Sequence, residues 1–333
     1  MISIKVLFIG GTGVISTSVS EAAVQDPDIE LFLFNRGSKR SSIPPKAKLI
    51  IGDIRDKHST SEVLKEYSFD VVVNWVAFKP EHIKSDISLF KGRVGQYIFI
   101  SSASAYKRPP EHYLVTEDTP LENDLWQYSK DKIDCEALLT KEASKDLPYT
   151  IVRPNYTYDQ TMIPFIFNSR RKRYTLIDRI RKGKKIIVPG DGTSLFTITH
   201  SRDLARGFIS LMGNKKAFGE AFHITSDEVK TWDQYALLTG KAAGKEPDIL
   251  HVTSEQIISL APEYAGGLLG DKSYSLVYDN SKLKKLVPGY KAVIPFEEGI
   301  KESVSWYDKN PDMCSTDDEF DLLCDRIVSR FGI

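Results

Sequence analysis

The sequence has few cysteines, no excess of charge and no long apolar run, and each absence excludes a class of protein. Its 3 cysteines show no Cys-x-x-Cys spacing, which argues against a disulfide framework and a structural zinc site. The 45 basic and 45 acidic residues leave a formal net charge of +0, so no overall field attracts nucleic acid or a membrane surface. No window approaches about 18 consecutive apolar residues, so we expect no membrane-spanning helix.

What remains is the composition of an ordinary globular protein. The 333 residues are 41% hydrophobic and 27% charged, and they are enough for one large domain or two interleaved ones. The opening residues MISIKVLFIGGTG hold only a short apolar run before glycines, which predicts a strand in place of a signal peptide. The 6 histidines are scattered and indicate no metal site, and the few cysteines suit a reducing compartment, so we expect a cytoplasmic protein.

Short apolar runs alternate with longer amphipathic stretches through the first half of the chain. The stretches at 16–24 and 59–67 are long enough for crossover helices. Most of the apolar runs are continuous, as strands covered on both faces require. Repeated strand–helix–strand units predict an α/β fold with a doubly wound parallel sheet of the Rossmann type. The predicted strands are residues 4–9, 30–34, 48–53, 70–76, 96–101 and 149–154.

Beyond residue 154 the pattern loosens into short helices, turns and isolated strands, such as 185–189 and 220–225. We expect a smaller, mixed C-terminal substrate lobe that closes over the carboxyl edge of the sheet, where ligands of open parallel sheets bind. The predicted dinucleotide-binding domain comprises residues 1–160 and about 196–240. The predicted substrate lobe comprises residues 161–195 and about 241–333.

A glycine-rich segment, GGTGVIS, directly follows the first predicted strand and has G-x-x-G-x-x-S spacing, with Ser16 at its third position. Glycine permits the backbone conformations of a tight turn and lets a helix N-terminus approach a pyrophosphate. Such a turn between a first strand and a first helix predicts dinucleotide binding, with a purely structural turn as the alternative. The residues expected to contact the cofactor here are Gly10, Thr12, Gly13, Val14 and Ile15.

The end of the second predicted strand indicates which dinucleotide binds. Asn35 stands where an acidic residue would bind the ribose hydroxyls of NAD, and Arg36 follows it. Because Asn35 does not repel a 2′-phosphate and Arg36 offers it a bidentate partner, we expect NADP. NAD stays the alternative if Arg36 belongs to a solvated loop. Asp53 and Ile54 lie within GDIRD, after the third predicted strand, and we expect them to contact the adenine side of the cofactor.

Two Tyr-x-x-x-Lys pairs occur, Tyr128 with Lys132 and Tyr278 with Lys282, so the spacing alone does not identify a catalytic pair. The first lies on a predicted helix, 125–141, that follows the strand ending near Ser102. An ammonium within about 4–6 Å of a phenol favours the phenolate. We therefore expect Ser102 to bind the substrate oxygen, Tyr128 to transfer its proton and Lys132 to lower the pKa of Tyr128. We also expect Tyr128 and Lys132 to contact the cofactor at its nicotinamide end.

These segments together resemble the extended and atypical branches of the short-chain dehydrogenase/reductase superfamily, within its NAD(P)-dependent epimerase/dehydratase family. The resemblance covers most of the chain and also includes NWVAFK, VRPNYTYD and GDGTSLFTITHSRDLA. It implies hydride transfer at a secondary alcohol or ketone of a sugar, nucleoside or nucleotide-sugar-like substrate, by an oxidoreductase or an epimerase. It also places Lys79 near the cofactor pyrophosphate and suggests a homodimer.

Two features keep an alternative open. Phe196 stands where many nucleotide-sugar enzymes of this family carry an arginine that binds the substrate diphosphate. The segments FNRG and LFTITH are similar to atypical members that include chloroplast stem-loop-binding proteins, so a non-catalytic NAD(P)-sensing or RNA-binding protein is the rival. The basic run 169–185, SRRKRYTLIDRIRKGKK, either contacts phosphates or is a solvated face. The complete Ser–Tyr–Lys set favours an enzyme, so we expect no nucleic-acid partner.

Overall fold

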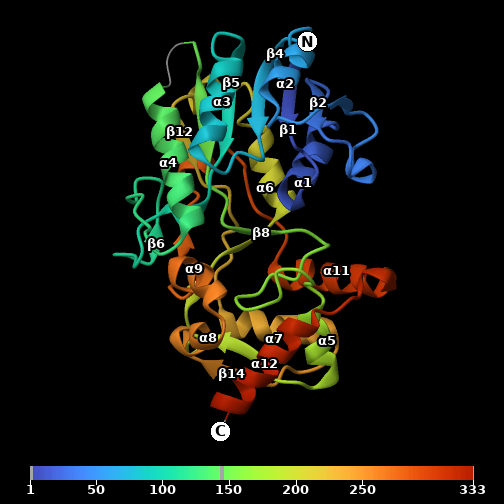
Figure 1. The fold of residues 1–333 in the computed structure, drawn as a ribbon, viewed down its shortest axis with the longest axis vertical. Helices are drawn as coiled ribbons and strands as arrows, with labels where there is room; N and C mark the ends of the chain where they lie inside the picture. Colours follow the sequence, from blue (N-terminus) through green and yellow to red (C-terminus); the bar gives the residue numbers. More distant parts are fainter. Residues whose placement is uncertain (1–2, 143–145, 333) are drawn as a thin grey trace.

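A sheet of seven strands forms the upper lobe (Figure 1), with the order β12-β7-β5-β4-β1-β2-β3. The computed structural model describes residues 3–142 and 146–332. Every pair in this sheet is parallel, which confirms the predicted doubly wound α/β fold. The strands are β1 Ile4–Ile9, β2 Ile29–Asn35, β3 Lys48–Ile51, β4 Phe69–Asn74, β5 Val94–Ile100, β7 Tyr149–Val152 and β12 Glu220–Phe222.

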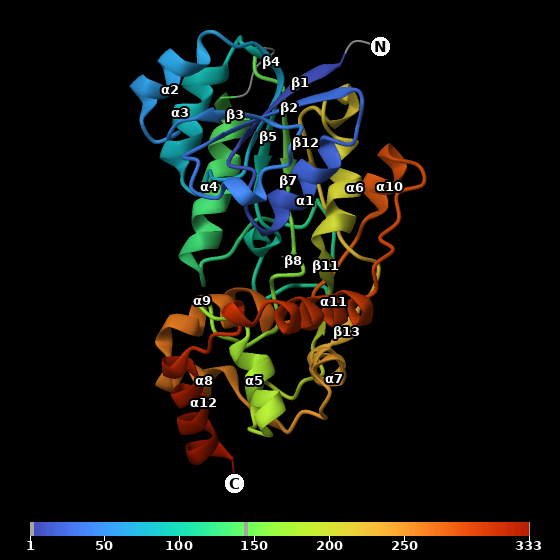
Figure 2. The same ribbon diagram turned by 90° about the vertical axis from the view of Figure 1, so that its right-hand side faces the viewer.

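Helices cover both faces of this sheet (Figure 2). Along β1, Val6 and Phe8 are buried on the face of α1 and α6, whereas Leu7 and Ile9 are buried on the opposite face. Both faces therefore need apolar side chains, which is why these strands read as continuous apolar runs. The helices are α1 Val14–Ala23 and α6 Ser201–Ile209 on one face, and α2 Lys57–Leu64, α3 Pro80–Phe90 and α4 Gln127–Glu142 on the other.

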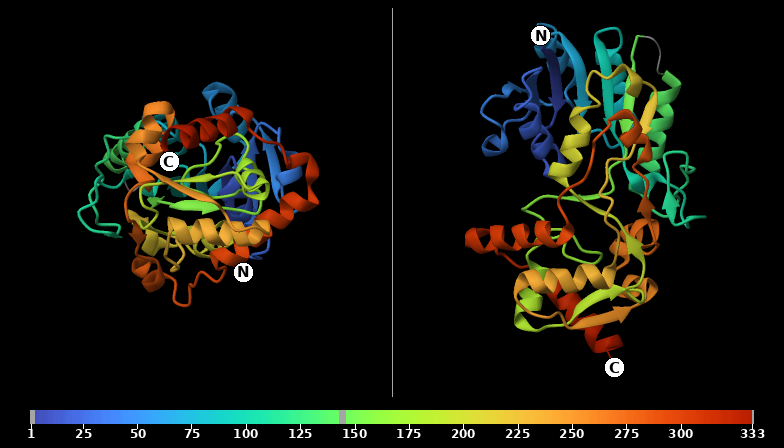
Figure 3. Two further views of the ribbon diagram at one scale, coloured as in Figure 1. Left: turned by 90° about the horizontal axis from the view of Figure 1, so that it is seen from below. Right: turned by 180° about the vertical axis from the view of Figure 1, so that it is seen from behind.

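The lower lobe is mainly helical and carries the C-terminus at its far end (Figure 3). Among the described residues, no helix is both long and apolar enough to span a bilayer. The helices of the lower lobe are α5 Thr175–Lys182, α7 Trp232–Ala243, α8 Ser254–Leu260, α9 Ala265–Gly267, α11 Phe296–Lys309 and α12 Asp318–Phe331. Short strand pairs complete the chain: β6 Leu114–Val115 with β15 Val277–Tyr278, β8 Tyr156–Tyr158 with β11 Ile198–His200, β9 Ile186–Pro189 with β14 Ile249–Val252, and β10 Leu195–Phe196 with β13 Lys230–Thr231.

Three segments pack differently from the sequence prediction. The run 220–225, expected as an isolated strand, contributes β12 to the edge of the main sheet beside β7. The α7 helix packs against α11 in the lower lobe, although residues up to about 240 were assigned to the dinucleotide-binding domain. Leu283 of α10 (Ser281–Leu286) joins the core of the upper lobe. The predicted division of the chain into two domains stays a proposal. The observed packing places α7 with the lower lobe and α10 with the upper lobe.

A buried guanidinium fastens the C-terminal helix to the rest of the lower lobe. Arg179 of α5 is 1% exposed and donates to the Lys185 carbonyl at 2.8 Å. It also donates to the carboxylates of Asp321 and Asp325 on α12. Because a buried cation left without these acceptors is costly, this cluster holds α12 in place.

We expect Arg179→Ala to lower the free energy of unfolding by about 1–3 kcal/mol, because the Lys185 carbonyl and one oxygen of each of the two carboxylates lose their donor, while Lys184 still donates to the other oxygen of each carboxylate. Lys182→Ala in the same helix removes an exposed pair with Asp178 and should change stability by less than about 0.5 kcal/mol. Urea unfolding of both variants measures the difference. Equal losses would show that Arg179 does not anchor α12.

Candidate active site

The predicted glycine turn lies between β1 and α1. Gly10 and Gly11 have φ of +99° and +93°, a backbone conformation that residues with a side chain rarely adopt. A Cβ on Gly11 would also lie 2.7 Å from the Leu33 side chain. Ser16, which replaces the expected third glycine, accepts a hydrogen bond from the Gly13 N–H at 2.8 Å through its hydroxyl. The Ser16 side chain thus joins Gly13, the residue before α1, to the first turn of that helix.

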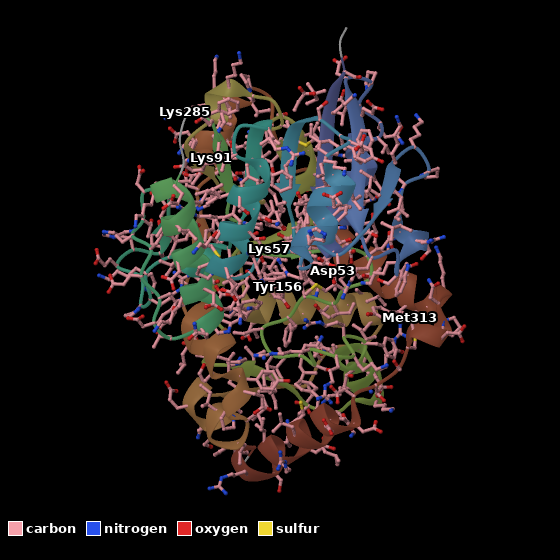
Figure 4. All side chains as sticks on the ribbon, turned by 45° about the horizontal axis from the view of Figure 1, so that its top comes forward. Asp53, Lys57, Lys91, Tyr156, Lys285 and Met313 are labelled. Atoms are coloured by element: carbon pink, nitrogen blue, oxygen red, sulfur yellow. The ribbon has the colours of Figure 1, made fainter. Side chains whose placement is uncertain are left out.

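A cavity of about 520 Å³, here called the cofactor cavity, opens beside this turn. Its volume lies within the usual range for small-molecule sites. It runs along the ends of β1 to β4, and Asp53 lies at the end of the upper lobe that faces the lower lobe (Figure 4). The predicted cofactor residues that line it are Gly10, Thr12, Gly13, Asn35, Arg36, Asp53 and Ile54.

Five predicted cofactor residues do not line the cavity. Tyr128 and Lys132 lie on α4, Val14 and Ile15 begin α1, and Lys79 is an exposed residue just before α3. Sequence reasoning gave no cofactor role to Ser38, Arg55, Trp75 or Phe78, which do line it. The signal for three of them was present, because Arg55 lies within GDIRD, and Trp75 and Phe78 lie within NWVAFK.

Asn35 uses its side chain to join two loops of this cavity. Its amide nitrogen donates to the Gly10 carbonyl at 3.2 Å, and its amide oxygen accepts from the Gly37 N–H at 2.8 Å. The amide therefore holds the glycine turn against the loop that follows β2. Arg36 is exposed beside the cavity and has no hydrogen-bond or ion-pair partner among the described residues.

The three predicted catalytic residues come together at the carboxyl edge of the sheet. The Lys132 ammonium donates to the carbonyls of Ala77 and Ile100, both at 2.7 Å, and lies 5.8 Å from the centre of the Tyr128 ring. Ser102 follows β5, and its hydroxyl lies close enough to the Tyr128 phenol to lower the pKa of that phenol. The structure thus places phenol, ammonium and hydroxyl in one cluster, next to Phe78 of the cofactor cavity.

Burial controls the protonation of this cluster. It raises the pKa of Tyr128 above its usual value, and the nearby Ser102 hydroxyl offsets this only in part. Burial also lowers the pKa of Lys132 to about 8. In the chain alone, burial dominates and the expected lowering of the Tyr128 pKa is not found; with a dinucleotide bound it stays a prediction. The Tyr128 phenol of the chain alone is therefore protonated at neutral pH.

The helix that carries Tyr128 is fixed to the sheet by a buried ion pair. Tyr128, Lys132 and Glu136 recur at four-residue spacing and so share one face of α4. The Glu136 carboxylate accepts from Arg153, just after β7, at 2.7 and 3.0 Å. Arg153 also donates to the Tyr106 hydroxyl at 2.9 Å. This bidentate ion pair fixes the position of α4 relative to the carboxyl ends of the strands.

A second buried carboxylate holds the segment after β4, which carries Phe78 and the carbonyl that binds Lys132. Asp86 of α3 accepts from the Asn74 amide at 2.5 Å and from the Tyr97 hydroxyl at 2.6 Å, both at one oxygen. The Asn74 amide oxygen then accepts from the Val76 N–H at 2.8 Å. Burial raises the pKa of Asp86 to about 6, although both hydrogen bonds lower it.

This raised pKa predicts a pH-dependent stability. The folded state favours the protonated form of Asp86. The contribution of this group to the free energy of unfolding is therefore present at low pH and is lost as the pH rises through about 6. We expect the stability of Asp86→Asn relative to wild type to increase by about 1 kcal/mol between pH 5 and pH 7.5. Urea unfolding at both values measures it, and a pH-independent difference would contradict the shifted pKa.

Comparison with known proteins gives the same fold and motifs. The chain is 28% identical over 266 residues to the chloroplast stem-loop binding protein of 41 kDa b from Arabidopsis thaliana, covering 76% of this chain and 67% of that protein. It is 29% identical over 167 residues to UDP-glucose 4-epimerase from Lactobacillus helveticus, covering 45% of this chain and 50% of that protein. The chain thus spans between half and two thirds of these relatives.

Solved structures extend the likeness to both lobes. UDP-glucuronic acid 4-epimerase from Bacillus cereus, in complex with UDP-glucuronic acid and NAD, superimposes with a TM-score of 0.71 over 92% of this chain and 100% of that chain. The identity is 18%, so this likeness concerns the fold. The NAD dependent epimerase/dehydratase family matches residues 6–225, which is more than half of the sequence. With its glycine turn, parallel sheet and Ser–Tyr–Lys cluster, the chain belongs to the NAD-dependent epimerase/dehydratase family.

Proposed function

We propose that this protein transfers hydride between a nicotinamide dinucleotide and a secondary alcohol or ketone of a sugar, nucleoside or nucleotide-sugar-like substrate. One observation carries the proposal. The phenol of Tyr128, the ammonium of Lys132 and the hydroxyl of Ser102 lie together where the cofactor cavity ends at Phe78. The relatives named UDP-glucose 4-epimerase and UDP-glucuronic acid 4-epimerase support the substrate class.

The cofactor cavity fits a dinucleotide. The positive φ angles at Gly10 and Gly11 and the lack of room for a Cβ at Gly11 let backbone N–H groups of the turn and of α1 face a pyrophosphate. Asp53 and Ile54 would hold the adenine end, and Trp75 and Phe78 lie toward the reactive end. When bound, the cofactor supplies the hydride acceptor or donor.

The chain's own groups handle the proton. Ser102 holds the substrate oxygen, and Tyr128, whose pKa is raised, gives its proton to that oxygen when a ketone is reduced. The reverse reaction needs the phenolate, which rising pH favours. Lys132 keeps its place by the two carbonyls at 2.7 Å, so it orients the strand ends and supplies positive charge beside the phenol.

The preference for NADP is part of the proposal. Arg36 lines the cofactor cavity and has no carboxylate partner among the described residues, so its guanidinium is free to bind a 2′-phosphate. Ser38 and Lys39 line the same end. Asn35 contributes indirectly, because its amide fixes the loop that carries Arg36.

The rival function, RNA binding, is supported by the name of the Arabidopsis relative. Its best candidate surface was the basic run 169–185, yet most of these cations are paired with carboxylates of the same chain. Paired cations contribute little to phosphate binding. Hydride transfer therefore remains the preferred function, and the homodimer and cytoplasmic location stay predictions.

Tyr128→Phe tests the proton donor. With nicotinamide dinucleotide and UDP-sugars as substrates, we expect turnover to fall by about 10²- to 10⁴-fold, because no other hydroxyl replaces the phenol. Cofactor affinity should stay within about twofold, because Tyr128 does not line the cofactor cavity. Tyr278→Phe changes the other Tyr-x-x-x-Lys pair; the buried Tyr278 hydroxyl accepts a hydrogen bond from Arg108 at 3.5 Å and Lys282 pairs with Glu220, so this change should leave the rate nearly unchanged. Equal rates for Tyr128→Phe and wild type would refute this role.

Arg36→Ala tests the cofactor preference. Loss of a charge-assisted hydrogen bond should weaken NADP binding by about 10- to 100-fold and NAD binding by less than about threefold. Fluorescence titration of both dinucleotides measures the ratio. Arg40→Ala serves as a control in the same loop, because Arg40 does not line the cavity. Equal losses for NAD and NADP in Arg36→Ala would remove the case for a 2′-phosphate site.

A further inference from the structure

Ser102 stands at the start of a short turn, Ala103–Ala105, which places a second hydroxyl against its own. The Ser104 N–H donates to the Ser102 hydroxyl oxygen at 3.2 Å, and the two hydroxyl oxygens lie 2.9 Å apart. Ser104 is 4% exposed, whereas Ser102 keeps part of its surface exposed. The role proposed for Ser102 requires that its hydrogen is directed at the substrate oxygen, so the direction of the bond between the two hydroxyls matters.

A third serine, on α4, fixes that direction. Ser129, the residue after Tyr128, is completely buried, and its hydroxyl donates to the Ser104 hydroxyl oxygen at 3.0 Å. Among the described residues, the Ser104 hydroxyl has no hydrogen-bond partner besides Ser102 and Ser129. A hydroxyl has one hydrogen to donate, and a buried one without an acceptor is costly. Because Ser129 already donates to Ser104, the hydrogen of Ser104 goes to Ser102.

The Ser102 oxygen then accepts from both the N–H and the hydroxyl of Ser104. These two bonds occupy both of its lone pairs, so its remaining hydrogen-bonding capacity is its own O–H. That hydrogen is left for an acceptor on the side of Tyr128, whose phenol lies close enough for Ser102 to lower its pKa. The three hydroxyls therefore form a chain with one direction, from Ser129 through Ser104 to Ser102.

The backbone of this turn is fixed by two further contacts. Asn123 is 2% exposed, and its amide nitrogen donates to the Ser104 carbonyl at 2.6 Å and to the Gly270 carbonyl at 2.7 Å. The Ala103 N–H donates to the Pro154 carbonyl at 2.9 Å. With the backbone held in this way, rotation about the side-chain bonds is the main freedom left to the serine hydroxyls. The hydrogen bond from Ser129 restricts that rotation.

We propose that Ser104 and Ser129 are positioning residues, which orient the Ser102 hydroxyl as a donor to the reacting oxygen of the substrate. The inference rests on the proposed function, because the orientation matters only if Ser102 binds that oxygen during hydride transfer. Negative charge develops on this oxygen when a ketone is reduced, and a donor aligned in advance need not reorient in the transition state. The same alignment serves the reverse reaction, in which the alcohol gives its proton to the Tyr128 phenolate.

Steady-state kinetics of the full chain, with NAD or NADP and UDP-sugars, measure the effect of the two serines. Ser104→Ala and Ser129→Ala should each lower turnover by about 3- to 30-fold and leave KM within about twofold, because the aligned donor matters more in the transition state than in the bound substrate. Ser101→Ala is the matched control. Ser101 is 3% exposed and its hydroxyl has no partner among the described residues, so turnover should stay within about twofold of wild type.

A double-mutant cycle separates positioning from a general structural role. If the two serines act through Ser102, adding Ser104→Ala or Ser129→Ala to Ser102→Ala should lower turnover by less than about twofold further. Losses of the same size in both backgrounds would overturn the inference, because the serines would then act independently of Ser102. An equal loss in Ser101→Ala would overturn it as well.

Neutron diffraction from crystals of the wild-type chain in D₂O locates the hydroxyl deuterium atoms and needs no substrate. A Ser104 deuterium directed at the Ser102 oxygen, with the Ser102 deuterium directed elsewhere, supports the inference. A Ser102 deuterium directed at the Ser104 oxygen overturns it, even if hydride transfer is observed. If the map shows the expected direction but wild type transfers no hydride, the proposed function fails and the positioning role fails with it, whereas the orientation of the hydroxyls stands.

Discussion

The ammonium of Lys132 ties together the parts of the candidate site. Its hydrogen bonds to the carbonyls of Ala77 and Ile100 connect α4 to the segments after β4 and β5. A buried ammonium is tolerated only where acceptors surround it, so these carbonyls must face the helix whenever the chain is folded. The same contact sets the position of Tyr128, one turn earlier, and of Phe78, next to Ala77. Positioning and charge at the site thus come from one interaction.

Two further buried carboxylates keep this arrangement rigid. The ion pair between Glu136 and Arg153 joins α4 to the end of β7. Asp86 orients the amide of Asn74, which in turn holds the segment after β4. Each network satisfies polar groups that would otherwise be stranded in the core, so movement of one element leaves a donor or acceptor unpaired. The Tyr128–Lys132 pair is therefore held by α3, α4 and the ends of β4 and β7, and not by a flexible loop.

Two cavities of the structure differ in how they present charge. The cofactor cavity uses backbone N–H groups of a glycine turn and one free guanidinium, whereas a second cavity is lined by Arg170 and Arg173 from one segment and by Lys272 from another. Most cations of the basic run 169–185 form ion pairs with carboxylates of the same chain. Among the described residues, Arg170, Arg173 and Lys172 of this run have no carboxylate partner, and only the two arginines line the second cavity. A general polyanion-binding face is therefore a poor description of this surface.

The sequence by itself determined the parallel sheet, because strands buried on both faces must be apolar throughout, and predicted helices and strands begin within three residues of those observed. It also indicated the glycine turn and the Tyr128–Lys132 pair, since each motif follows a predicted strand of the sheet. Only the tertiary structure decided that Lys79 does not line the cofactor cavity, that Asn35 joins two loops, and that burial raises the pKa of Tyr128. Those outcomes depend on which groups distant segments bring within hydrogen-bond reach and on how much water they exclude, and neither is encoded in residue spacing.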